Sequence, residues 1–372
     1  MVIIKSAFLS NLPGFKWAMN LEITGTGSYI PETKVANADF LAHHFFTPKE
    51  ESIDLPGEEV VEKFKAITGI EERRYARTNQ MASDLGAQAS RQALASSGVD
   101  PETLDGIIVA HNFGDMTHNG RQVDILPSLA TRVKYQLKIK NPNCIAFDIL
   151  YGCPGWLQGL IVAYTHIKAG QGQKYLIVGT ETLSRTLDPH DRDSMIFADG
   201  AGACVVEARE DKGNSGILST ASQTFTEEEA FYLFYGASNN PKEKDHRRYI
   251  KMHGSKIFQF ALTHVPAAMQ KCLDSSGVGI DEVKKILIHQ ANEKMDEAIV
   301  KRFYRLYKKP APEKIMPMSI GYLGNSSVAT VPTLLDQLLK GQLKGHSVQK
   351  GDVLLLASVG AGMSINAVTY RV

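Results

Sequence analysis

The sequence predicts an α/β protein made of two similar halves, each with a largely parallel sheet. Apolar runs of strand length alternate with segments that are apolar at helical spacing, which is typical of parallel sheets covered by helices. In addition, Ser96-Ser-Gly-Val99 recurs as Ser275-Ser-Gly-Val278, an offset of 179 residues. The same offset aligns three further pairs of segments: 107–109 with 286–288, 175–178 with 354–357, and the helix after Cys153 with the helix after Pro332. Several elements at one offset indicate a duplicated α/β unit.

The first half begins with a strand at 21–30, which follows an N-terminal extension, residues 1–20. Gly25-Thr-Gly27 lies in this strand, but neither a third small residue nor a helix follows at once, so we do not predict a dinucleotide site. The later elements follow from their apolar spacing: a helix at 81–97, a buried strand at 104–111, a polar loop at 112–126, a helix near 127–137, strands at 144–149 and 174–179 with a helix at 157–164 between them, and a glycine-rich turn into a strand at 197–207.

The second half repeats this order. A long helix at 253–275 precedes a strand at 285–289, and a loop at 321–327 precedes a helix that begins near Val328. We therefore divide the chain into an N-terminal half, 21–210, and a C-terminal half, 211–372.

Composition excludes several classes of function. The 372 residues are 43% hydrophobic and 22% charged, as in ordinary globular proteins, and the formal net charge of +1 gives no reason to expect a nucleic-acid partner. No apolar run reaches the length of a membrane span, and the N-terminus lacks the pattern of a signal peptide. We expect a cytoplasmic protein that does not act at a membrane.

The four cysteines follow neither a metal-binding spacing nor a disulfide framework, which also favours a reducing compartment. The adjacent His43 and His44 have no further ligands at a suitable spacing, so no metal site is predicted. Three acidic residues near sheet ends are interpreted as structural partners rather than as acids or bases: Glu181, Asp199 and Glu207.

Cys153 is the best candidate for a reactive side chain. It follows a buried strand, in the turn Gly152-Cys153-Pro-Gly-Trp, and precedes an apolar helix in which proline suits the first turn. At such a helix start, free backbone N–H groups and the positive end of the helix dipole lower the pKa of a thiol. The sequence therefore predicts a cysteine nucleophile.

His289 and Asn325 lie at similar positions in the second half. His289 ends the strand 285–289, and Asn325 lies in the glycine-flanked loop 321–327. In parallel α/β sheets, functional sites gather at the carboxyl ends of strands. A cysteine with a histidine and an asparagine is a set of residues that can hold an acyl group as a thioester and act on it.

The chain resembles a known family in motifs that span residues 21–372. These agree in order and spacing and are Ile23-Thr-Gly-Thr-Gly-Ser-Tyr-Ile-Pro31, Thr68-Gly-Ile-Glu-Glu-Arg73, the Cys153 turn, the run from Asp191 to Ala203, Met252-His-Gly254, His289-Gln-Ala-Asn292, Gly324-Asn-Ser-Ser327 and Gly360-Ala-Gly362. The sequence is thereby similar to the thiolase-fold condensing enzymes, and within them to the β-ketoacyl-acyl-carrier-protein synthase III family. The resemblance implies a five-layered αβαβα fold with two duplicated βαβαβαββ halves, and a homodimer.

It also implies a reaction. Cys153 takes an acyl group from a primer thioester, His289 and Asn325 stabilise the enolate formed when malonyl-acyl-carrier protein loses CO₂, and the product is a β-ketoacyl-carrier protein. The backbone N–H groups of Cys153 and Ala361 would form the oxyanion hole. The substrates are acyl-coenzyme A or acyl-carrier protein together with malonyl-carrier protein, and no cofactor is implied.

Five residues are assigned to substrate binding through the resemblance: Asn292, Arg192, Lys294, Leu126 and Trp156. Lys294 stands where an arginine is commoner, and Leu126 stands where relatives gate the acyl pocket across the dimer. Family members primed by coenzyme A carry a tryptophan and an arginine where this chain has Lys63 and Ile67. These departures favour a carrier protein or another thioester as acyl donor, and a longer or unusual primer.

A basic run after the His289 strand is either a solvated helix face or a dock for an acidic carrier protein: Lys301, Arg302, Arg305, Lys308 and Lys309. Two alternatives to primary synthase III activity stay open. One is a related condensing enzyme of a specialised pathway, of the resorcinol or polyene type. The other is a non-condensing acyltransferase on the same fold, although Asn325 favours decarboxylation.

Overall fold

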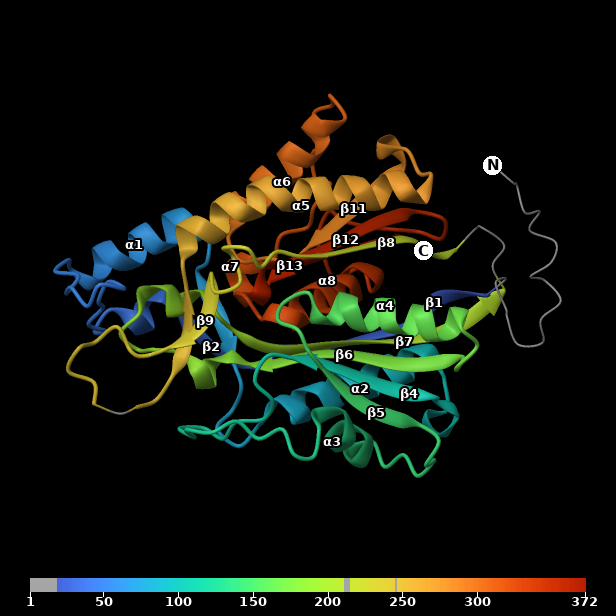
Figure 1. Ribbon diagram of the computed structural model, residues 1–372, viewed down its shortest axis with the longest axis horizontal. Helices are drawn as coiled ribbons and strands as arrows, with labels where there is room; N and C mark the ends of the chain where they lie inside the picture. Colours follow the sequence, from blue (N-terminus) through green and yellow to red (C-terminus); the bar gives the residue numbers. More distant parts are fainter. Residues whose placement is uncertain (1–18, 211–214, 245) are drawn as a thin grey trace.

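The computed structural model describes residues 19–210, 215–244 and 246–372, and its core consists of two sheets with helices on both faces of each (Figure 1). The predicted extension, 1–20, lies outside the described residues except for residues 19 and 20, which belong to the first strand. Strands of the first sheet come from residues between Met19 and Glu210, and strands of the second from residues between Gly216 and Arg371.

The first sheet has five strands in the order β1-β7-β6-β4-β5. β4 lies parallel to β5 and β6, whereas β7 runs antiparallel to β6 and β1. The bounds of these strands are β1 (Met19–Tyr29), β4 (Gly106–His111), β5 (Ile145–Leu150), β6 (Lys174–Thr182) and β7 (Asp199–Glu210).

The second sheet has four strands in the order β11-β12-β13-β8. β11 and β12 are parallel, and β13 runs antiparallel to β12 and β8. Their bounds are β8 (Gly216–Thr224), β11 (Val283–Ile288), β12 (Val353–Gly360) and β13 (Ser364–Arg371).

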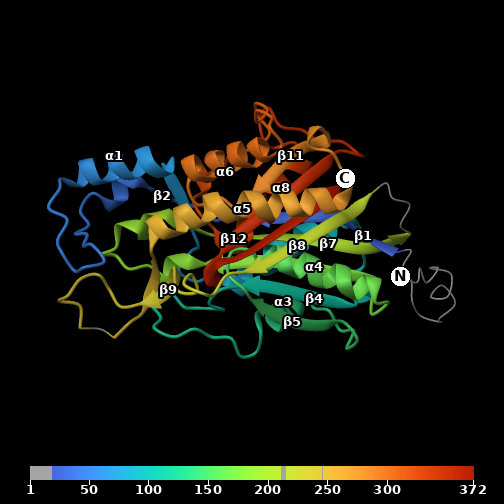
Figure 2. The ribbon, with the colours of Figure 1, turned by 45° about the horizontal axis from the view of Figure 1, so that its top comes forward.

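Three layers of helices complete the five-layered αβαβα fold that the resemblance implied (Figures 1 and 2). α4 and α8 are sandwiched between the sheets, α2 and α3 cover the outer face of the first sheet, and α5 and α6 that of the second. Their bounds are α2 (Ala82–Ser97), α3 (Leu129–Gln136), α4 (Gly155–Lys168), α5 (Gly254–Ser276), α6 (Glu293–Leu306) and α8 (Thr330–Leu339). α4 is apolar on most of its surface because sheets pack on both of its sides.

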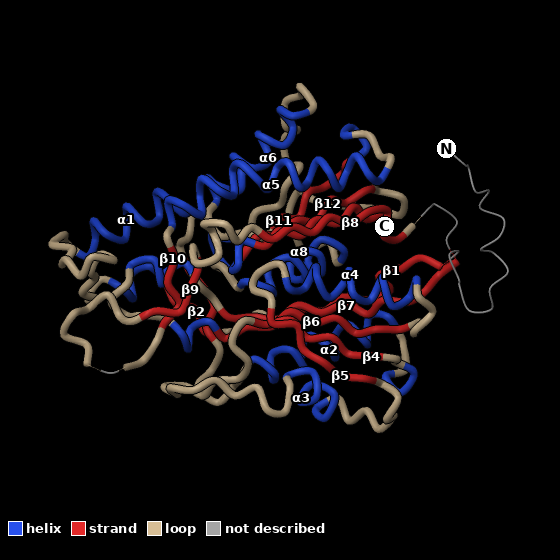
Figure 3. Tube along the Cα trace, viewed as in Figure 1, coloured by secondary structure: helices blue, strands red, loops and turns tan. Residues whose placement is uncertain are grey.

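The remaining elements gather at the end of the molecule where the parallel strands finish (Figure 3). Two antiparallel pairs lie there, β2 (Thr33–Ala36) with β3 (Glu72–Tyr75) and β9 (Leu233–Gly236) with β10 (Tyr249–Met252), as do α1 (Gly57–Thr68) and the short α7 (Ile320–Leu323). Single turns of 3₁₀ helix connect elements throughout: η2 (Asn37–Phe40), η3 (Pro101–Thr103), η4 (Leu183–Thr186), η5 (Arg192–Ile196), η6 (Ile280–Glu282), η7 (Ser327–Ala329) and η8 (Ala361–Met363).

The duplication is visible in the sheets, with one difference. β8, β13, β12 and β11 repeat the order and directions of β1, β7, β6 and β4. β5 has no counterpart, because the segment 324–329, at the 179-residue offset, is a loop that ends in η7. The second half therefore lacks one strand of the expected βαβαβαββ pattern.

Within the described ranges, no helix combines the length and the apolar character needed to cross a membrane.

Candidate active site

Cys153 lies in the turn between β5 and α4. The chain leaves β5 at Leu150, turns at Gly152, which has a φ of 68°, and enters the helix at Gly155 with Pro154 as N-cap. A positive φ suits glycine, because a β-carbon would strain it. Cys153 is thus one residue farther from the helix than the sequence predicted, and as a whole residue it is half-buried.

The end of β12 packs closely against this turn. A β-carbon on Gly360 would lie 2.7 Å from the backbone N of Cys153 and 2.8 Å from its Cβ, so only glycine fits there. The neighbouring backbone N of Ala361 lies 3.1 Å from where a Gly152 β-carbon would be. The backbone groups of Cys153 and Ala361 that we predict to form the oxyanion hole therefore lie on two loops in direct contact.

His289 and Asn325 meet Cys153 at a small inner cavity of about 60 Å³. His289 follows β11 and is held by its backbone N–H, which donates to Ala357 O at 2.9 Å. Asn325 precedes η7, and both side chains are buried. Apart from these three residues the lining is mostly apolar: Ile196, Phe197, Leu233, Met252, Ile257, Ala291, Met295, Val359, Gly360 and Met363. The structure therefore brings the three predicted catalytic residues together in a mostly apolar cavity.

Burial controls the protonation of the site. It raises the pKa of the Cys153 thiol to about 12, although a hydrogen bond from Ser327 acts in the opposite direction. Burial likewise lowers the pKa of His289 to about 4, opposed by the backbone of Ser327. The expectation of a lowered thiol pKa at Cys153 is therefore wrong, because the loss of solvation raises the pKa by more than the hydrogen bonds to the sulfur lower it. Both side chains are neutral at pH 7.

A chain of hydrogen bonds that the sequence did not reveal reaches Cys153. The Ser327 hydroxyl donates to Cys153 Sγ at 3.2 Å and accepts from Asn112 Nδ2 at 2.9 Å. The backbone N–H and the Nδ2 group of Asn112 both donate to Oε1 of the buried Glu181, the former at 2.7 Å. Asn325 Oδ1 accepts from the Ser327 N–H at 2.8 Å, which leaves Asn325 Nδ2 available as a donor. Ser327 was within reach of sequence analysis, since it belongs to the Gly324-Asn-Ser-Ser327 motif.

An outer cavity of about 680 Å³ leads to the inner one. The two share part of their lining, namely Ile196, Met252, Ile257, Ala291 and Met295. Arg192 and Asn292 line the outer cavity, and Ile67, from α1, lies at its rim. Asn292 also caps α6, where its Oδ1 accepts from the Met295 N–H at 3.0 Å. Lys294 lies exposed in the first turn of α6 and does not line the cavity.

Neither Trp156 nor Leu126 lines the inner or the outer cavity. Trp156 is 1% exposed and packs between the sheets, with its Cβ against Gly179, so its assignment to substrate binding is wrong. Leu126 is 86% exposed at the end of the 112–126 loop. A single chain therefore gives Leu126 no contact with substrate.

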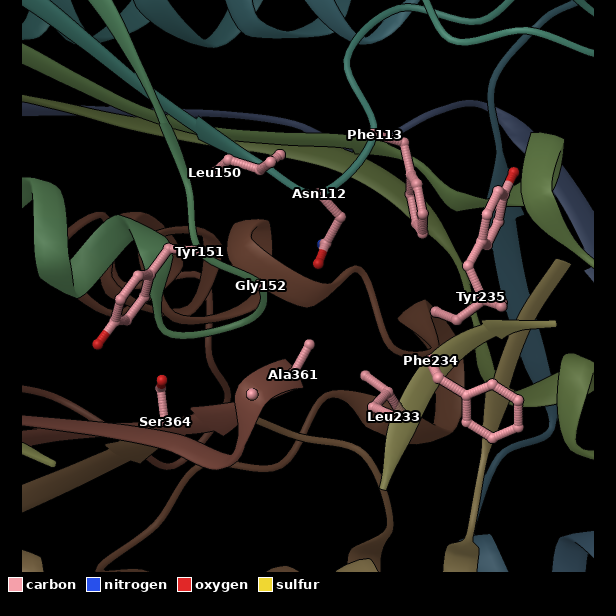
Figure 4. Close-up of a pocket in the computed structure, with 12 residues that line it drawn as sticks. Asn112, Phe113, Leu150, Tyr151, Gly152, Leu233, Phe234, Tyr235, Ala361 and Ser364 are labelled. Atoms are coloured by element: carbon pink, nitrogen blue, oxygen red, sulfur yellow. The ribbon is translucent and has the colours of Figure 1, made fainter. Parts of the chain in front are cut away.

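A third cavity, the aromatic cavity, opens beside the Cys153 turn and has a volume of about 360 Å³ (Figure 4). The rings of Phe113 and Tyr235 lie in contact beside it, tilted by 34° with centroids 5.1 Å apart, and Asn112 points into it. Its other lining residues are Leu150, Tyr151, Gly152, Leu233, Phe234, Ile250, Ala361, Gly362 and Ser364. Among the described residues, no group of three His, Cys, Asp or Glu side chains could hold a metal ion.

A cysteine at a helix start in one half, facing a histidine and an asparagine from the other half of an αβαβα fold, defines a thiolase-fold condensing acyltransferase. The profile of 3-oxoacyl-[acyl-carrier-protein] synthase III matches residues 147–225, and that of its C-terminal part matches residues 273–372. The chain is 33% identical to β-ketoacyl-[acyl-carrier-protein] synthase III 1 of Vibrio vulnificus (strain YJ016) over 354 residues, which cover 95% of this chain and 100% of that one.

Solved structures agree. The chain is similar to 3-oxoacyl-[acyl-carrier-protein] synthase III from Aquifex aeolicus VF5, with a TM-score of 0.76, 29% identity, and coverage of 95% of this chain and 100% of that one. It is also similar to the enzyme from Pseudomonas aeruginosa PAO1, with a TM-score of 0.77, 26% identity, and coverage of 95% and 98%. The chain belongs to the 3-oxoacyl-[acyl-carrier-protein] synthase III family, which confirms the family and the fold inferred from its motifs.

Proposed function

We propose that this protein condenses an acyl primer, held as a thioester on Cys153, with malonyl-acyl-carrier protein to give a β-ketoacyl-carrier protein. The observation that carries the proposal is the meeting of Cys153, His289 and Asn325 at one buried cavity that a wider cavity connects to the surface. Membership of the family supports the same reaction.

In the first step Cys153 gives up its proton and its sulfur attacks the primer thioester; a new C–S bond forms, the C–S bond to the donor breaks, and the donor takes up a proton and leaves as its thiol. The oxygen of the tetrahedral intermediate would accept hydrogen bonds from the backbone N–H groups of Cys153 and Ala361. Such preorganised donors stabilise charge strongly in a site that excludes water. The close contact of Gly360 with Cys153 holds these two loops in place.

In the second step malonyl-carrier protein loses CO₂, and the electron pair of the broken C–C bond passes to an enolate. His289 and Asn325 donate hydrogen bonds to the enolate oxygen. The neutral state of His289 suits this role, because a neutral imidazole donates a hydrogen bond without giving up a full proton. The enolate carbon then attacks the Cys153 thioester, a C–C bond forms, and the cysteine thiolate is released.

The acyl group of the primer would lie in the aromatic cavity, which Gly152 and Ala361 line beside the Cys153 turn and which shares Leu233 with the inner cavity. The phosphopantetheine arm of either substrate would enter through the outer cavity, past Arg192 and Asn292. Ile67 and Lys63, at or near its rim, do not supply the tryptophan and arginine that clamp coenzyme A in relatives, and Lys63 pairs with Glu59 instead. This supports a carrier protein as acyl donor. The chemistry uses thioester substrates and requires no cofactor.

An acyl-carrier protein is the partner that the rim of the outer cavity suits. Arg192 and Lys256 line this cavity, and Lys294 is exposed beside it, so three cations surround the entrance. They would attract an acidic partner at the cavity entrance, although Arg192 pairs with Asp193 at 3.3 Å, as Lys301 and Lys309 of the basic run after His289 pair with Glu297 and Asp281.

A homodimer would cover the exposed edge of the first sheet. β5 is an edge strand, and Leu150 at its end is 68% exposed. Other exposed apolar side chains lie on β5, on α3 and in the preceding loop: Val123, Ile125, Leu126, Tyr135 and Ile145. An unpaired strand with exposed apolar side chains is a site for pairing with a second copy. We expect Leu150→Lys to shift the protein from dimer to monomer in light scattering, whereas Leu339→Lys, at the C-terminal end of α8 and 39% exposed, should not.

We also place the protein in the cytoplasm, since all four cysteines are free thiols and three of them are buried.

The decisive experiment is a panel of acyl-coenzyme A and acyl-carrier-protein primers, with malonyl-carrier protein as extender, followed by intact-mass detection of the acyl-enzyme and the β-ketoacyl product. We expect an adduct on Cys153, and its loss in Cys153→Ala. An adduct that persists in Cys153→Ala would contradict the assignment of the nucleophile, and acyl transfer without loss of CO₂ would favour the non-condensing alternative.

A further inference from the structure

Three side chains outside the predicted catalytic set form a continuous hydrogen-bonded chain that ends on the nucleophile. It runs from Glu181, at the end of β6, through Asn112 and Ser327 to Cys153 Sγ. These residues come from β6, from the loop after β4, from η7 and from the β5–α4 turn, so only the fold brings them together.

We propose that Glu181 and Asn112 are positioning residues that direct the Ser327 hydroxyl at Cys153, so that Ser327 donates the hydrogen bond that stabilises the thiolate. The inference rests on the proposed function only in that Cys153 is the nucleophile.

The direction of the chain follows from the donors and acceptors. Asn112 Nδ2 has two hydrogens, one directed to Glu181 Oε1 and the other to Ser327 Oγ. Because Ser327 accepts this bond, its own hydrogen is free for Cys153 Sγ at 3.2 Å. If the amide of Asn112 were reversed, Oδ1 would face Ser327, and the hydroxyl would donate to Oδ1 instead of the sulfur.

Glu181 prevents that reversal. Its Oε1 accepts from both the backbone N–H and the Nδ2 of Asn112, so a reversed amide would bring two oxygens together. The backbone of Ser327 is held in the left-handed region, with a φ of 53°, and its N–H is bound by Asn325 Oδ1. A serine rarely adopts this conformation unless its surroundings impose it, and such residues cluster at functional sites.

The charge of Glu181 acts against its positioning role. Burial raises the pKa of Glu181 to about 7, and an ionised Glu181 disfavours a second negative charge on Cys153. Other groups that face Glu181 are His111, from β4, and Asp199, from β7. His111 is itself bound to Asp148 of β5 at 3.0 Å. Above pH 7 the thiolate should therefore form less readily than its hydrogen bond alone would allow.

Alkylation of Cys153 by iodoacetamide tests the inference, because only the thiolate reacts and no acyl substrate is needed. The other three cysteines are buried, so intact mass reports Cys153. We expect Ser327→Ala to slow alkylation about tenfold at pH 8, the effect of losing one hydrogen bond to a charged group. Ser326→Ala is the matched control, since Ser326 bonds Thr330 rather than the sulfur, and should react like the wild type.

A double-mutant cycle tests whether Asn112 acts through Ser327. Asn112→Ala should slow alkylation, and Asn112→Ala combined with Ser327→Ala should react no more slowly than Ser327→Ala alone. Independent, multiplying losses would overturn the positioning role of Asn112. Equal rates for Ser327→Ala and the wild type would overturn the proposal as a whole.

Glu181→Gln separates orientation from charge, because glutamine keeps an acceptor for Asn112. The wild-type plot of log rate against pH should flatten near pH 7, where Glu181 ionises, whereas the variant should rise steadily and react several-fold faster at pH 8. Parallel plots would contradict the effect of the Glu181 charge on the Cys153 thiolate, whereas the positioning role is decided by the cycle at Asn112 and Ser327. If this variant does not fold, the cycle at Asn112 and Ser327 decides alone. Because no primer is used, a failed primer panel with the expected alkylation pattern would refute the proposed reaction and not this inference.

Discussion

The two halves of the chain follow one plan and differ where the active site lies. In the first half, the third strand of the repeated unit is β5, and Cys153 follows the end of this strand. At the equivalent place in the second half, Gly324 and Ser327 have positive φ angles, and the Asn325 side chain binds the Ser327 N–H. Neither feature is compatible with a strand.

This segment pairs with the other half instead of with its own sheet. Asn325 N–H donates to Ile196 O at 2.9 Å, and Ala198 N–H donates to Asn325 O at 2.8 Å. Where the first half has a strand, the second half has a loop that crosses to the first half and presents two polar side chains, Asn325 and Ser327, to the site of Cys153. The comparison shows that the two halves supply different parts of one site.

The largest effect should come from removing the second half's contribution to the enolate. We expect His289→Ala or Asn325→Ala to slow malonyl decarboxylation about 10²- to 10³-fold, the usual loss for one donor to a developing oxyanion. Acylation of Cys153 should fall much less, because that step uses the other oxyanion hole. Stopped assays for CO₂ release and for the acyl-enzyme mass measure the two steps. Equal losses in both would show that the halves do not divide the chemistry in this way.

A smaller effect should follow from forcing the halves apart at Gly360. Its φ allows any residue, so Gly360→Ala tests only space, and the added β-carbon would lie 2.7 Å from Cys153 N. We expect the rate of Cys153 acylation to fall about 10²-fold, as small displacements of reacting groups do. Gly279→Ala is the control, because its nearest neighbour, at 3.4 Å, is the flexible Glu282 side chain. Similar rates for the two variants would contradict the role of this contact.

The smallest effects concern stability. Burial lowers the pKa of His289 to about 4, so between pH 4 and 6.5 the unfolded chain binds a proton that the folded chain does not, and stability falls as the pH falls. Glu181 has a raised pKa of about 7, so its folded form binds the extra proton between pH 4.5 and 7, and stability falls as the pH rises. Each term amounts to about 3 kcal/mol and the two nearly cancel.

Single substitutions at His289 and Glu181 should separate the two opposed contributions to the free energy of unfolding, measured in urea at several pH values. Relative to the wild type, His289→Asn should lose stability as the pH rises from 4 to 7, and Glu181→Gln should gain it. If both variants followed the wild-type curve, the pKa values of the two groups would not be shifted in the folded protein.

Much of the molecule was predictable because the signals are local. Strands such as β4, β6, β11 and β12 are short apolar runs. Gly98 and Gly277 are the C-caps of α2 and α5, and the matching Ser-Ser-Gly-Val sequences around them indicated both the helix ends and the duplication. The motif order led to the correct family, and the three catalytic residues that the motifs implied lie together at one cavity.

Other expectations failed because they depend on surroundings that local sequence does not show. Trp156 follows the nucleophile closely, yet a helix places it in the core between two sheets. The thiol of Cys153 is at the start of a helix, but its pKa depends on the whole cavity around it. The missing strand of the second half follows from pairing with residues 196–198, more than a hundred positions away.

By itself, then, the sequence determined the α/β class, the duplication and the family, and it pointed to Cys153, His289 and Asn325 as the candidate nucleophile and its partners, because helix and strand periodicity and motif spacing are properties of neighbouring residues. Only the tertiary structure decided the protonation of Cys153 and His289, the route from the surface to the sulfur, and the chain from Glu181 through Asn112 to Ser327. Solvation and hydrogen bonding act through space, and these side chains come from four separate segments that only the packed sheets hold together.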